Sequence, residues 1–532
     1  MKSSSDAKKI SRPNTANAPS RRRQLALLAF LSGIAVCLYR LLFVYPLVPY
    51  EMGVDSPLLL AASLRMWWGQ SLYLDFVHHI APGSCDLYYA LFRLFGPKAW
   101  IPSAALWCLG VGFAAVGIWA AGYFVRGWMK YVPALLFIAI PFRTRLDATH
   151  HWFSSLFVLG AATVLLKERK QLRLVAAGVL CAVASWFTQS RGEITIGSLV
   201  LFLLWEYANG HHDRRKFLKA VALLLASFCA AFGLLMGHHF WTAGVSNVIN
   251  QTYVFVARYA RFYRPHDNFD KYWYWDDLMN YTGFRSKRLL VIGLRVFMYL
   301  LIPAIYLLAG VRLIFVERKW RNSGSAPIVL FTLVGSFSFL LIARSPGLYR
   351  LSYDSMFAFI LLSWYLAANK PGRLAIRGFA VGMAVLLAYF CHSSKVTILN
   401  LPAGQIAYRA DPEYLDIERW LSSNTRPGDY VYQPFWGSFY FSYQLQNPTP
   451  IPSVSNTRAV PPEDLSQVVR CLGKNPVHYI IWDEQLNSSY DDLGADYLLP
   501  LRAFMRDYRL VHTFGDGRQL WRNDSVASSP RE

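Results

Sequence analysis

Charged residues are scarce in this chain, and acids are scarcer than bases. Asp, Glu, Lys and Arg make up only 16% of the 532 residues, well below the roughly 25% of a soluble domain. Hydrophobic residues make up 54% of the chain and aromatic residues 16%. This balance excludes an ordinary soluble globular protein and indicates a membrane protein.

Three further absences narrow the class of protein. The seven cysteines follow neither the spacing of a disulfide framework nor that of a metal site. No internal repeat is present in the sequence, which argues against a transporter built from two related halves. No small-residue cleavage site follows the first apolar stretch, so we expect an uncleaved membrane anchor rather than a signal peptide.

Long apolar stretches are what the chain has in abundance. They recur from Leu25 to Cys391, and most are about 17 to 25 residues long, enough for a helix to cross a hydrocarbon core of roughly 30 Å. We therefore predict an α-helical polytopic membrane protein with about eleven transmembrane helices. The expected spans are 25–48, 100–125, 129–142, 150–166, 172–188, 194–208, 217–241, 289–315, 326–343, 352–368 and 373–391.

The net charge of +22 is explained by topology rather than by nucleic-acid binding. With the N-terminus inside, the inner segments hold 23 Lys or Arg in 65 residues, against 15 in 118 residues of the outer connections. Lysine and arginine accumulate in cytoplasmic loops, so this bias predicts a cytoplasmic N-terminus. An odd number of spans then places the C-terminal part outside the cytoplasm.

The composition divides the chain into three parts. Residues 1–24 are rich in Ser, Asn and basic side chains, so we expect a disordered basic cytoplasmic tail. Residues 25–392 form the expected transmembrane domain, with large external loops at 49–99 and 242–288. The second loop interleaves aromatic rings with arginines, which suits a helix in the membrane interface or a cover over a groove.

Residues 393–532 have the composition of a soluble domain. Helical periodicity at 411–424 is followed by an R-P-G-D turn and a strand at 430–434. Further helices are expected at 463–473 and 501–508, alternating with strands in the remainder of this part. We therefore predict a small extracytoplasmic α/β domain at the C-terminal end.

Four ionisable side chains stand close together in the loop after the first span: Asp55, Asp75, His78 and His79. Ionisable groups held beside a membrane usually have a function. Asp55 suits a general base for an attacking hydroxyl, although Asp before Ser and Pro also commonly caps a helix; the two roles are compatible. The histidines suit a metal ion or a phosphate, yet they match no recognised metal signature, and interfacial polar contacts account for them equally well.

Other external connections carry charged residues on the same predicted face of the membrane. They contribute Arg143, Arg145, Asp147, His150 and His151, then Arg191 and Glu193, then Arg344, Arg350 and Asp354. Arginine makes charge-assisted, often bidentate contacts with phosphate, so Arg191, Arg344 and Arg350 are candidates for binding a phosphate leaving group. Arginines at the outer ends of spans also extend toward lipid headgroups. The convergence of these clusters on one face favours a functional site.

The order of residues in the first loop is characteristic. Asp55 is followed by a G-x-x-x-Y-x-D pattern ending at Asp75 and by an H-x-x-P-G turn that begins at His79. This order resembles the first external loop of the C superfamily of polytopic glycosyltransferases (GT-C), such as protein O-mannosyltransferases and bacterial aminoarabinose transferases. Residues 416–434, with their N-T-x-P-G-D turn, resemble the start of the family's external domains. Val54-Asp55 stands where these transferases carry a paired Asp-Glu, so the substrate subgroup stays open.

The resemblance implies an integral membrane hexosyl- or pentosyltransferase. Such an enzyme moves a sugar, with inversion, from a polyprenyl-phosphate donor to a glycan, lipid or protein acceptor outside the cytoplasm. The family's catalytic carboxylate carries over as Asp55, with Asp75 as a second loop acid, and loop 242–288 is expected to line the donor's lipid groove. The expected substrate- and phosphate-binding residues are His79, Arg191, Arg344 and Arg350. No cofactor is certain, and a divalent metal ion is left open.

Three other classes of protein stay open. A polytopic transporter predicts broken helices and ionisable residues near the bilayer midplane. An en bloc oligosaccharide transferase or O-antigen ligase uses similar carriers with pyrophosphate donors. A structural membrane protein has no activity at all. The expected location is a bacterial inner membrane, because no retention signal is found.

Overall fold

The computed structural model describes most of the chain, and every structural statement below concerns these described residues. They are 21–53, 55–143, 145–257, 300–316, 320–342, 348–368, 370–391, 396–410, 415–434, 437–454, 462–483 and 498–525. Most of the predicted loop 242–288 lies outside them. So do the tail 1–20 and Arg344, one of the predicted phosphate-binding residues.

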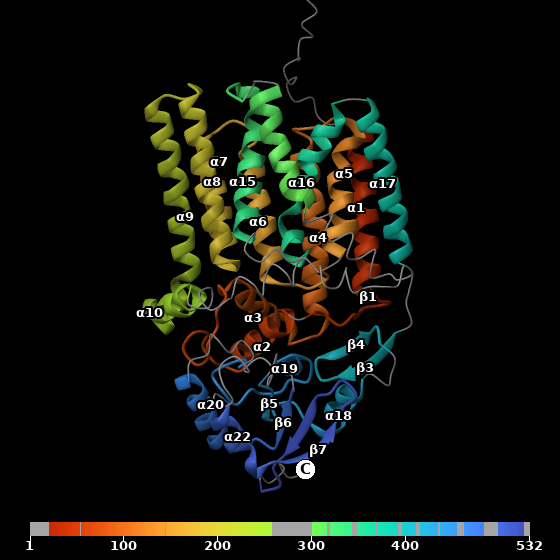
Figure 1. The fold of residues 1–532 in the computed structure, drawn as a ribbon, viewed down its shortest axis with the longest axis vertical. Coiled ribbons are helices and arrows are strands. Elements are labelled where there is room, and N and C mark those ends of the chain that lie inside the picture. The colour runs from red at the N-terminus through yellow and green to blue at the C-terminus, as the bar shows by residue number, and fades with distance from the viewer. Residues whose placement is uncertain are drawn as a thin grey trace, which may run out of the picture.

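Most of the described residues of 21–391 lie in helices, and the long ones form a bundle (Figure 1). Five helical segments are long and apolar enough to cross a membrane: Arg21–Leu42, Trp100–Ala121, Arg214–Ala243, Ser323–Ile342 and Pro371–Tyr389. The segments Gly127–Phe142, Gln171–Phe187 and Leu300–Phe315 are apolar but shorter. The protein is therefore a helical, polytopic membrane protein. The number of spans that the sequence suggests stays a prediction.

Each range expected to span the membrane contains helix among its described residues. In chain order these are α1 (Arg21–Leu42), α4 (Trp100–Ala121), η1 (Gly127–Tyr131) with α5 (Val132–Phe137) and the π-helical η2 (Ile138–Phe142), α6 (His150–Val164), α7 (Gln171–Phe187), α8 (Gln189–Ala208), α9 (Arg214–Ala243), a helix over 300–311 continued by η4 (Arg312–Val316), α15 (Ala326–Ile342), α16 (Leu348–Ala367) and α17 (Lys370–Phe390). Helices that are apolar on all sides suit burial or contact with lipid.

Successive helices of the bundle run in opposite directions (Figure 1). Segments 43–99 and 143–149 and the beginnings of α8 and α16 consequently meet at one end, which we call the loop end. Two short helices cover this end: α2 (Asp55–Trp67) and α3 (Gly83–Phe95). Their buried side chains, among them Leu59 and Phe92, belong to the same hydrophobic core as the bundle.

The C-terminal region, which comprises the described residues of 396–525, lies against the loop end (Figure 1). A hairpin pairs β3 (Thr397–Leu401) with β4 (Gly404–Tyr408). A second sheet has the strand order β5-β6-β8-β7, in which β5 and β6 are parallel and the other pairs are antiparallel. The strands of this sheet are β5 (Val431–Tyr432), β6 (Tyr479–Trp482), β7 (Arg509–Thr513) and β8 (Gln519–Arg522). The helices of the C-terminal region are α18 (Asp416–Asn424), α19 (Phe439–Ser442), α20 (Pro462–Lys474) and α22 (Leu499–Phe504).

The first loop joins the C-terminal region to the bundle. A short hairpin of β1 (Phe43–Val44) and β2 (Val48–Pro49) follows α1. Tyr50 then forms a parallel bridge with Ala407 of β4, and the Glu51 N–H donates to the Ala407 carbonyl at 2.9 Å. The chain entering α2 is therefore held between the bundle on one side and β4 on the other.

Glycines allow helices of the bundle to approach closely, as small residues commonly do in membrane proteins. A Cβ atom at Gly192 of α8 would lie 2.2 Å from the Cys181 carbonyl oxygen of α7. Gly197, five residues further along α8, has no such neighbour within 4 Å. The tight contact of α7 with α8 therefore depends on a glycine at 192 and not at 197.

We expect Gly192→Ala to lower the thermal unfolding temperature of the purified protein in detergent, because its Cβ would collide with backbone atoms. Overpacking of this kind costs roughly 1–3 kcal/mol. Gly197→Ala is the matched control, and it should be neutral or stabilising by roughly 0.5–1 kcal/mol because alanine favours a helix over glycine. Equal unfolding temperatures for the two variants would contradict the close contact.

Candidate functional site

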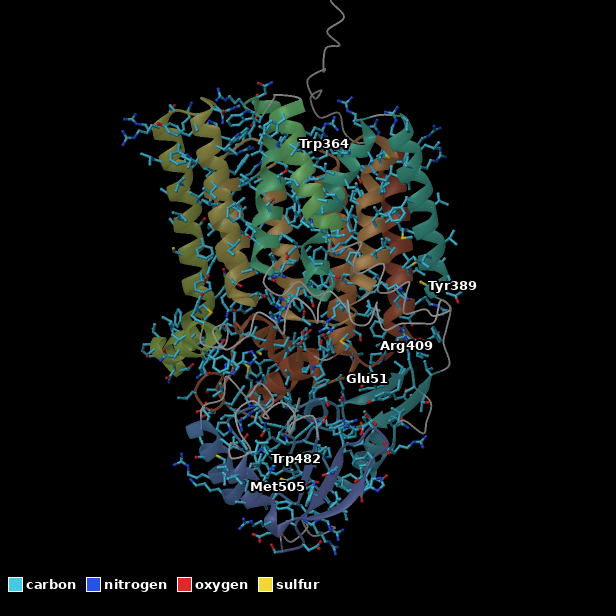
Figure 2. The ribbon with its side chains drawn as sticks, in the orientation of Figure 1. Glu51, Trp364, Tyr389, Arg409, Trp482 and Met505 are labelled. Carbon is cyan, nitrogen blue, oxygen red and sulfur yellow. The ribbon has the colours of Figure 1, made fainter. Side chains whose placement is uncertain are left out.

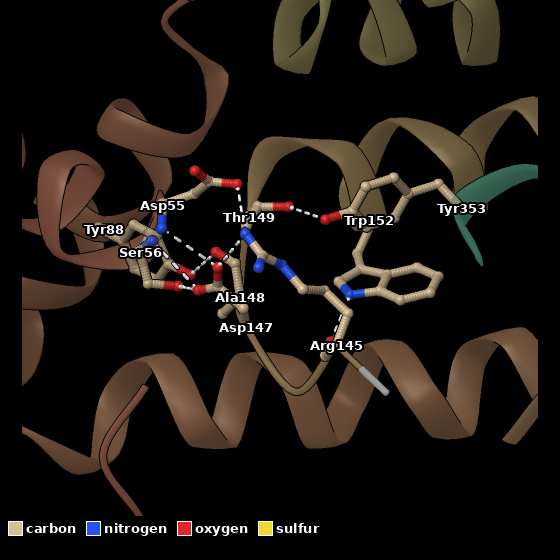
Figure 3. A network of polar contacts seen from close by, with 9 residues as sticks. All are labelled: Asp55, Ser56, Tyr88, Arg145, Asp147, Ala148, Thr149, Trp152 and Tyr353. Atoms are coloured by element: carbon tan, nitrogen blue, oxygen red, sulfur yellow. Dashed lines mark hydrogen bonds and ion pairs between the residues drawn. The ribbon is translucent and has the colours of Figure 1, made fainter. Parts of the chain in front are cut away.

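Two carboxylates and one guanidinium gather where α2 begins (Figure 3). Arg145 Nη2 lies 2.8 Å from Asp55 Oδ2 and 3.3 Å from Asp147 Oδ2. The Asp147 side chain is only 2% exposed, whereas that of Asp55 is 31% exposed. The cluster therefore contains one buried acid and one acid that solvent or a ligand can reach.

Asp147 caps the first turn of α2. Its carboxylate accepts hydrogen bonds from the backbone N–H groups of Asp55, at 3.2 Å, and Ser56, at 3.1 Å, and from the Ser56 hydroxyl. The first N–H groups of a helix have no partner within the helix, and they carry a partial positive charge that a carboxylate stabilises. Pro57, next in the chain, has no N–H to satisfy. The cap thus comes from Asp147, and the Asp55 side chain is directed to Arg145 instead.

Burial governs the protonation of Asp147. It raises the pKa of this carboxyl, repulsion from Asp55 raises it further, and Arg145 and the Ser56 hydroxyl oppose the shift. Arg145 thus compensates two acids at once. Among the described residues, Asp55 makes its ion pair through Oδ2, so Oδ1 is available to a ligand.

The segment 145–149 that carries Arg145 and Asp147 is held by aromatic side chains from three helices (Figure 3). Tyr88 of α3 donates to the Ala148 carbonyl at 2.8 Å, and Trp152 of α6 donates to the Arg145 carbonyl at 3.0 Å. Thr149 donates to the hydroxyl of Tyr353 of α16 at 3.4 Å. These bonds position the charged cluster against the bundle.

A second polar group lies within the loop end of the bundle. Arg191 of α8 forms a buried ion pair with Asp354 of α16, and it also donates to the Ser155 hydroxyl at 2.8 Å. The imidazoles of His150 and His151 lie within electrostatic range of Arg191 and Arg350, and the His151 ring packs 4.7 Å from that of Tyr353.

Several buried polar atoms of this group have no hydrogen-bond partner among the described residues. They are His150 Nδ1, His151 Nδ1 and Asp354 Oδ2. Buried polar groups are nearly always hydrogen-bonded, and each exception calls for an explanation. Three such atoms beside two arginines are consistent with a place where a polar ligand binds.

The structure brings some of the predicted site residues together and leaves others apart. Asp55 lies in the Arg145 cluster, and Arg191 and Arg350 lie beside His150 and His151. Asp75 is exposed in a turn of its own, where its carboxylate accepts the Ser71 N–H at 2.6 Å. The structure therefore brings Asp55 and the arginines to the loop end of the bundle and places Asp75 in a separate turn.

His79 stacks on Phe255 at a centroid distance of 3.3 Å, and burial lowers its pKa to about 4. Burial and then the charge of His79 lower the pKa of His78 to about 3, and its ring contacts Cys85 Sγ at 3.4 Å. Both rings are therefore neutral at pH 7. No group of three or more His, Cys, Asp or Glu side chains among the described residues is arranged to hold a metal ion. A divalent metal ion stays open.

Sequence reasoning did not assign roles to Arg145, Asp147 or the partner of Arg191. All three belong to charged connections that the sequence singles out, but their partners are distant in the chain. Asp147 contacts Ser56 across 91 positions, and Arg191 contacts Asp354 across 163. The sequence singled out these residues only by their charge.

Comparison with known proteins identifies the fold. No protein-family model matches the chain, and no curated protein matches it. Among solved structures, the crystal structure of ArnT from Cupriavidus metallidurans bound to undecaprenyl phosphate is similar, with a TM-score of 0.53 and 13% sequence identity over 96% of this chain and 100% of that chain. At this level of identity the likeness shows the fold alone, which this chain shares with ArnT.

We expect Asp147→Ala to destabilise the protein, because it leaves two α2 amides and the Ser56 hydroxyl without their acceptor. Buried groups left in this way cost about 1–3 kcal/mol, measurable as a lower thermal unfolding temperature in detergent. Asp213→Ala is a matched control, since Asp213 caps α9 but is exposed, and water replaces it there. An equal loss in both variants would argue against the tertiary cap.

Proposed function

We propose that this protein is an integral membrane glycosyltransferase that moves a sugar from a polyprenyl-phosphate donor to an acceptor with inversion. The observation that carries the proposal is the accessible carboxylate of Asp55, held by Arg145 at the loop end of a GT-C fold. The similar ArnT structure contains undecaprenyl phosphate, which supports a polyprenyl-phosphate donor.

Asp55 acts as the general base. Its carboxylate accepts the proton of the acceptor hydroxyl as that oxygen attacks the anomeric carbon of the sugar, and the bond to the lipid phosphate breaks on the opposite face. A single displacement of this kind inverts the anomeric centre. Arg145 orients the base, and Asp147 acts as a positioning residue through α2, because general bases work only within hydrogen-bond reach of the proton.

The arginines of α8 and α16 stabilise the departing lipid phosphate. A guanidinium placed where negative charge develops lowers the barrier, and arginine matches phosphate geometry. Arg191 is buried against Asp354, whereas Arg350 is partly exposed, so we assign the first phosphate contact to Arg350, with Arg191 behind it. The Nδ1 atoms of His150 and His151, which have no hydrogen-bond partner in the part of the chain that the structure describes, are available to the same phosphate. Arg344, Asp75 and His79 keep supporting roles in the proposal.

The proposed topology has eleven spans, a cytoplasmic N-terminus and a C-terminal α/β domain outside the cytoplasm, in a bacterial inner membrane. The distribution of lysine and arginine supports this orientation. After α9, the segments α10 (Val245–Ile249) and η3 (Asn250–Val254) expose apolar side chains, among them Val245 and Ile249. Such a surface suits the membrane interface, and we propose that 242–288 lines the groove for the donor's lipid.

We expect Asp55→Asn to reduce transfer of a radiolabelled sugar from polyprenyl phosphate in membranes by about 10²–10⁴-fold, the usual contribution of a general base. The variant should keep its unfolding temperature, because Asp147 rather than Asp55 caps α2. Asp213→Asn, at the opposite end of the bundle, should transfer normally. Full transfer by Asp55→Asn would show that Asp55 is not the general base.

Arg350→Gln is expected to lower kcat/KM for the donor about tenfold or more, because a hydrogen bond to a charged group is worth about 1.5–3 kcal/mol. The KM for the donor should change more than the KM for the acceptor. Arg373→Gln is the control, because it is the same substitution at the end of the bundle away from the loop end. The phosphate role is wrong if both variants have the same donor kinetics.

A further inference from the structure

A cavity of about 600 Å³ lies between the first loop and the C-terminal region. Its volume falls within the roughly 300–1,000 Å³ of small-molecule sites. Figure 2 shows Glu51, one of its lining residues, between the bundle and the strands of the C-terminal region. The other side chains that matter here are Glu418, Arg518, Tyr50, Phe439 and Tyr443.

The charged groups of the cavity are incompletely paired. Glu418 is only 8% exposed, and its Oε2 has no hydrogen-bond partner among the described residues. Its other oxygen lies 3.9 Å from Arg518 Nη2, but Arg518 also pairs with Asp516. Burial and then the charge of Glu418 raise the pKa of Glu51 to about 7. A buried acceptor atom without a donor is costly, so Glu418 calls for a ligand that donates a hydrogen bond.

Aromatic side chains also line the cavity, among them Tyr50, Phe439 and Tyr443. The ring centroid of Phe439 lies 4.9 Å from the guanidinium carbon of Arg518, and the Tyr443 hydroxyl donates to the Glu418 carbonyl at 2.9 Å. Rings offer an apolar surface to the C–H faces of a sugar, while carboxylates accept hydrogen bonds from its hydroxyls. An anionic group such as a phosphate has no hydrogen to donate to the unpaired Glu418 oxygen. An acyl chain would leave the Glu418 oxygen unsatisfied.

One wall of the cavity adjoins the charged cluster described above, although Asp55, Arg145 and Asp147 are not themselves lining residues. Gly53, Pro57 and Leu58 line it, and they flank Asp55 in the chain. A Cβ atom at Gly53 would lie only 3.6 Å from Asp147 Oδ2. A ligand held in the cavity is therefore adjacent to the first turn of α2, which carries the proposed base.

We infer that this cavity binds a neutral sugar of the acceptor, whose hydroxyls donate to Glu418 and Glu51, and that it presents an acceptor hydroxyl to Asp55. The assignment as an acceptor site rests on the proposed function. Binding of a neutral sugar by this cavity can be measured without any transfer.

The binding test uses the purified full chain in detergent micelles and saturation-transfer difference NMR. The neutral probes are lactose, mannobiose, N,N′-diacetylchitobiose and rhamnose; the cationic and anionic probes are glucosamine and glucose 6-phosphate. We expect at least one neutral probe to bind, and Glu418→Gln to weaken it about tenfold, in keeping with the strength of a charge-assisted hydrogen bond. Glu168→Gln is the matched control, because Glu168 is exposed far from the cavity and its substitution should leave binding unchanged.

Ser438→Phe provides a second variant, since Ser438 lines the cavity and a phenyl ring there would fill part of it. Ser438→Phe should abolish probe binding, so the inference can still be tested if Glu418→Gln fails to fold. The unfolding temperature of each variant shows whether it is folded. Binding of no neutral probe to the wild type, or unchanged binding in a folded variant, overturns the inference. Binding of glucosamine or glucose 6-phosphate alone also overturns it, in favour of a charged ligand.

A transfer assay separates this inference from the proposed function. With the bound probe as acceptor, Glu418→Gln should raise the acceptor KM about tenfold and leave the donor KM unchanged. If the wild type transfers no sugar from any polyprenyl-phosphate donor while a neutral probe still binds, the proposed function fails and the acceptor assignment with it. If the wild type transfers sugar and Glu418→Gln has a normal acceptor KM, only the acceptor cavity fails.

Discussion

The hydrogen bonds between Asp147 and the first turn of α2 hold the loop end of this protein together. A buried carboxylate is costly unless it is compensated, and here two amides, a hydroxyl and Arg145 compensate it. The same contacts determine where Asp55 stands. A change in this cap would move the helix start, the proposed base and the wall of the neighbouring cavity together.

The start of α2 lies between two polar environments. On the bundle side, the Arg191–Asp354 pair joins α8 to α16 close to His150 and His151. On the other side, the cavity with Glu418 separates α2 from the C-terminal region. In the proposed reaction the first environment receives the donor phosphate and the second receives the acceptor. A single displacement requires the acceptor oxygen to approach the anomeric carbon opposite the leaving phosphate, with the base within hydrogen-bond reach of that oxygen.

Much of the architecture follows from local patterns in the sequence. Apolar stretches predict helices wherever they are long enough, and the alternation of periodicity after residue 411 predicts the elements of the C-terminal region, such as α18 and β6. Asp55 was found because it stands beside a span and before a helix. Arg145 was singled out only for its charge, and its pairing with Asp55 was not predicted, because pairing depends on packing between segments 90 positions apart. Local periodicity carries no information about such contacts.

The sequence by itself determined that the chain is a helical membrane protein with many of its charged residues in the connections or near helix ends, because hydrophobicity and helix length are properties of each segment alone. The residues expected in two of these connections, Arg191, Arg350 and Asp354 among them, lie instead in the first two turns of α8 and α16. Only the tertiary structure decided which of those charges meet. It paired Arg191 with Asp354, gave the cap of α2 to Asp147, and left Asp75 in a turn of its own. Each outcome depends on distance and burial in the folded chain, because electrostatic and hydrogen-bond energies are set by these quantities and not by order along the sequence.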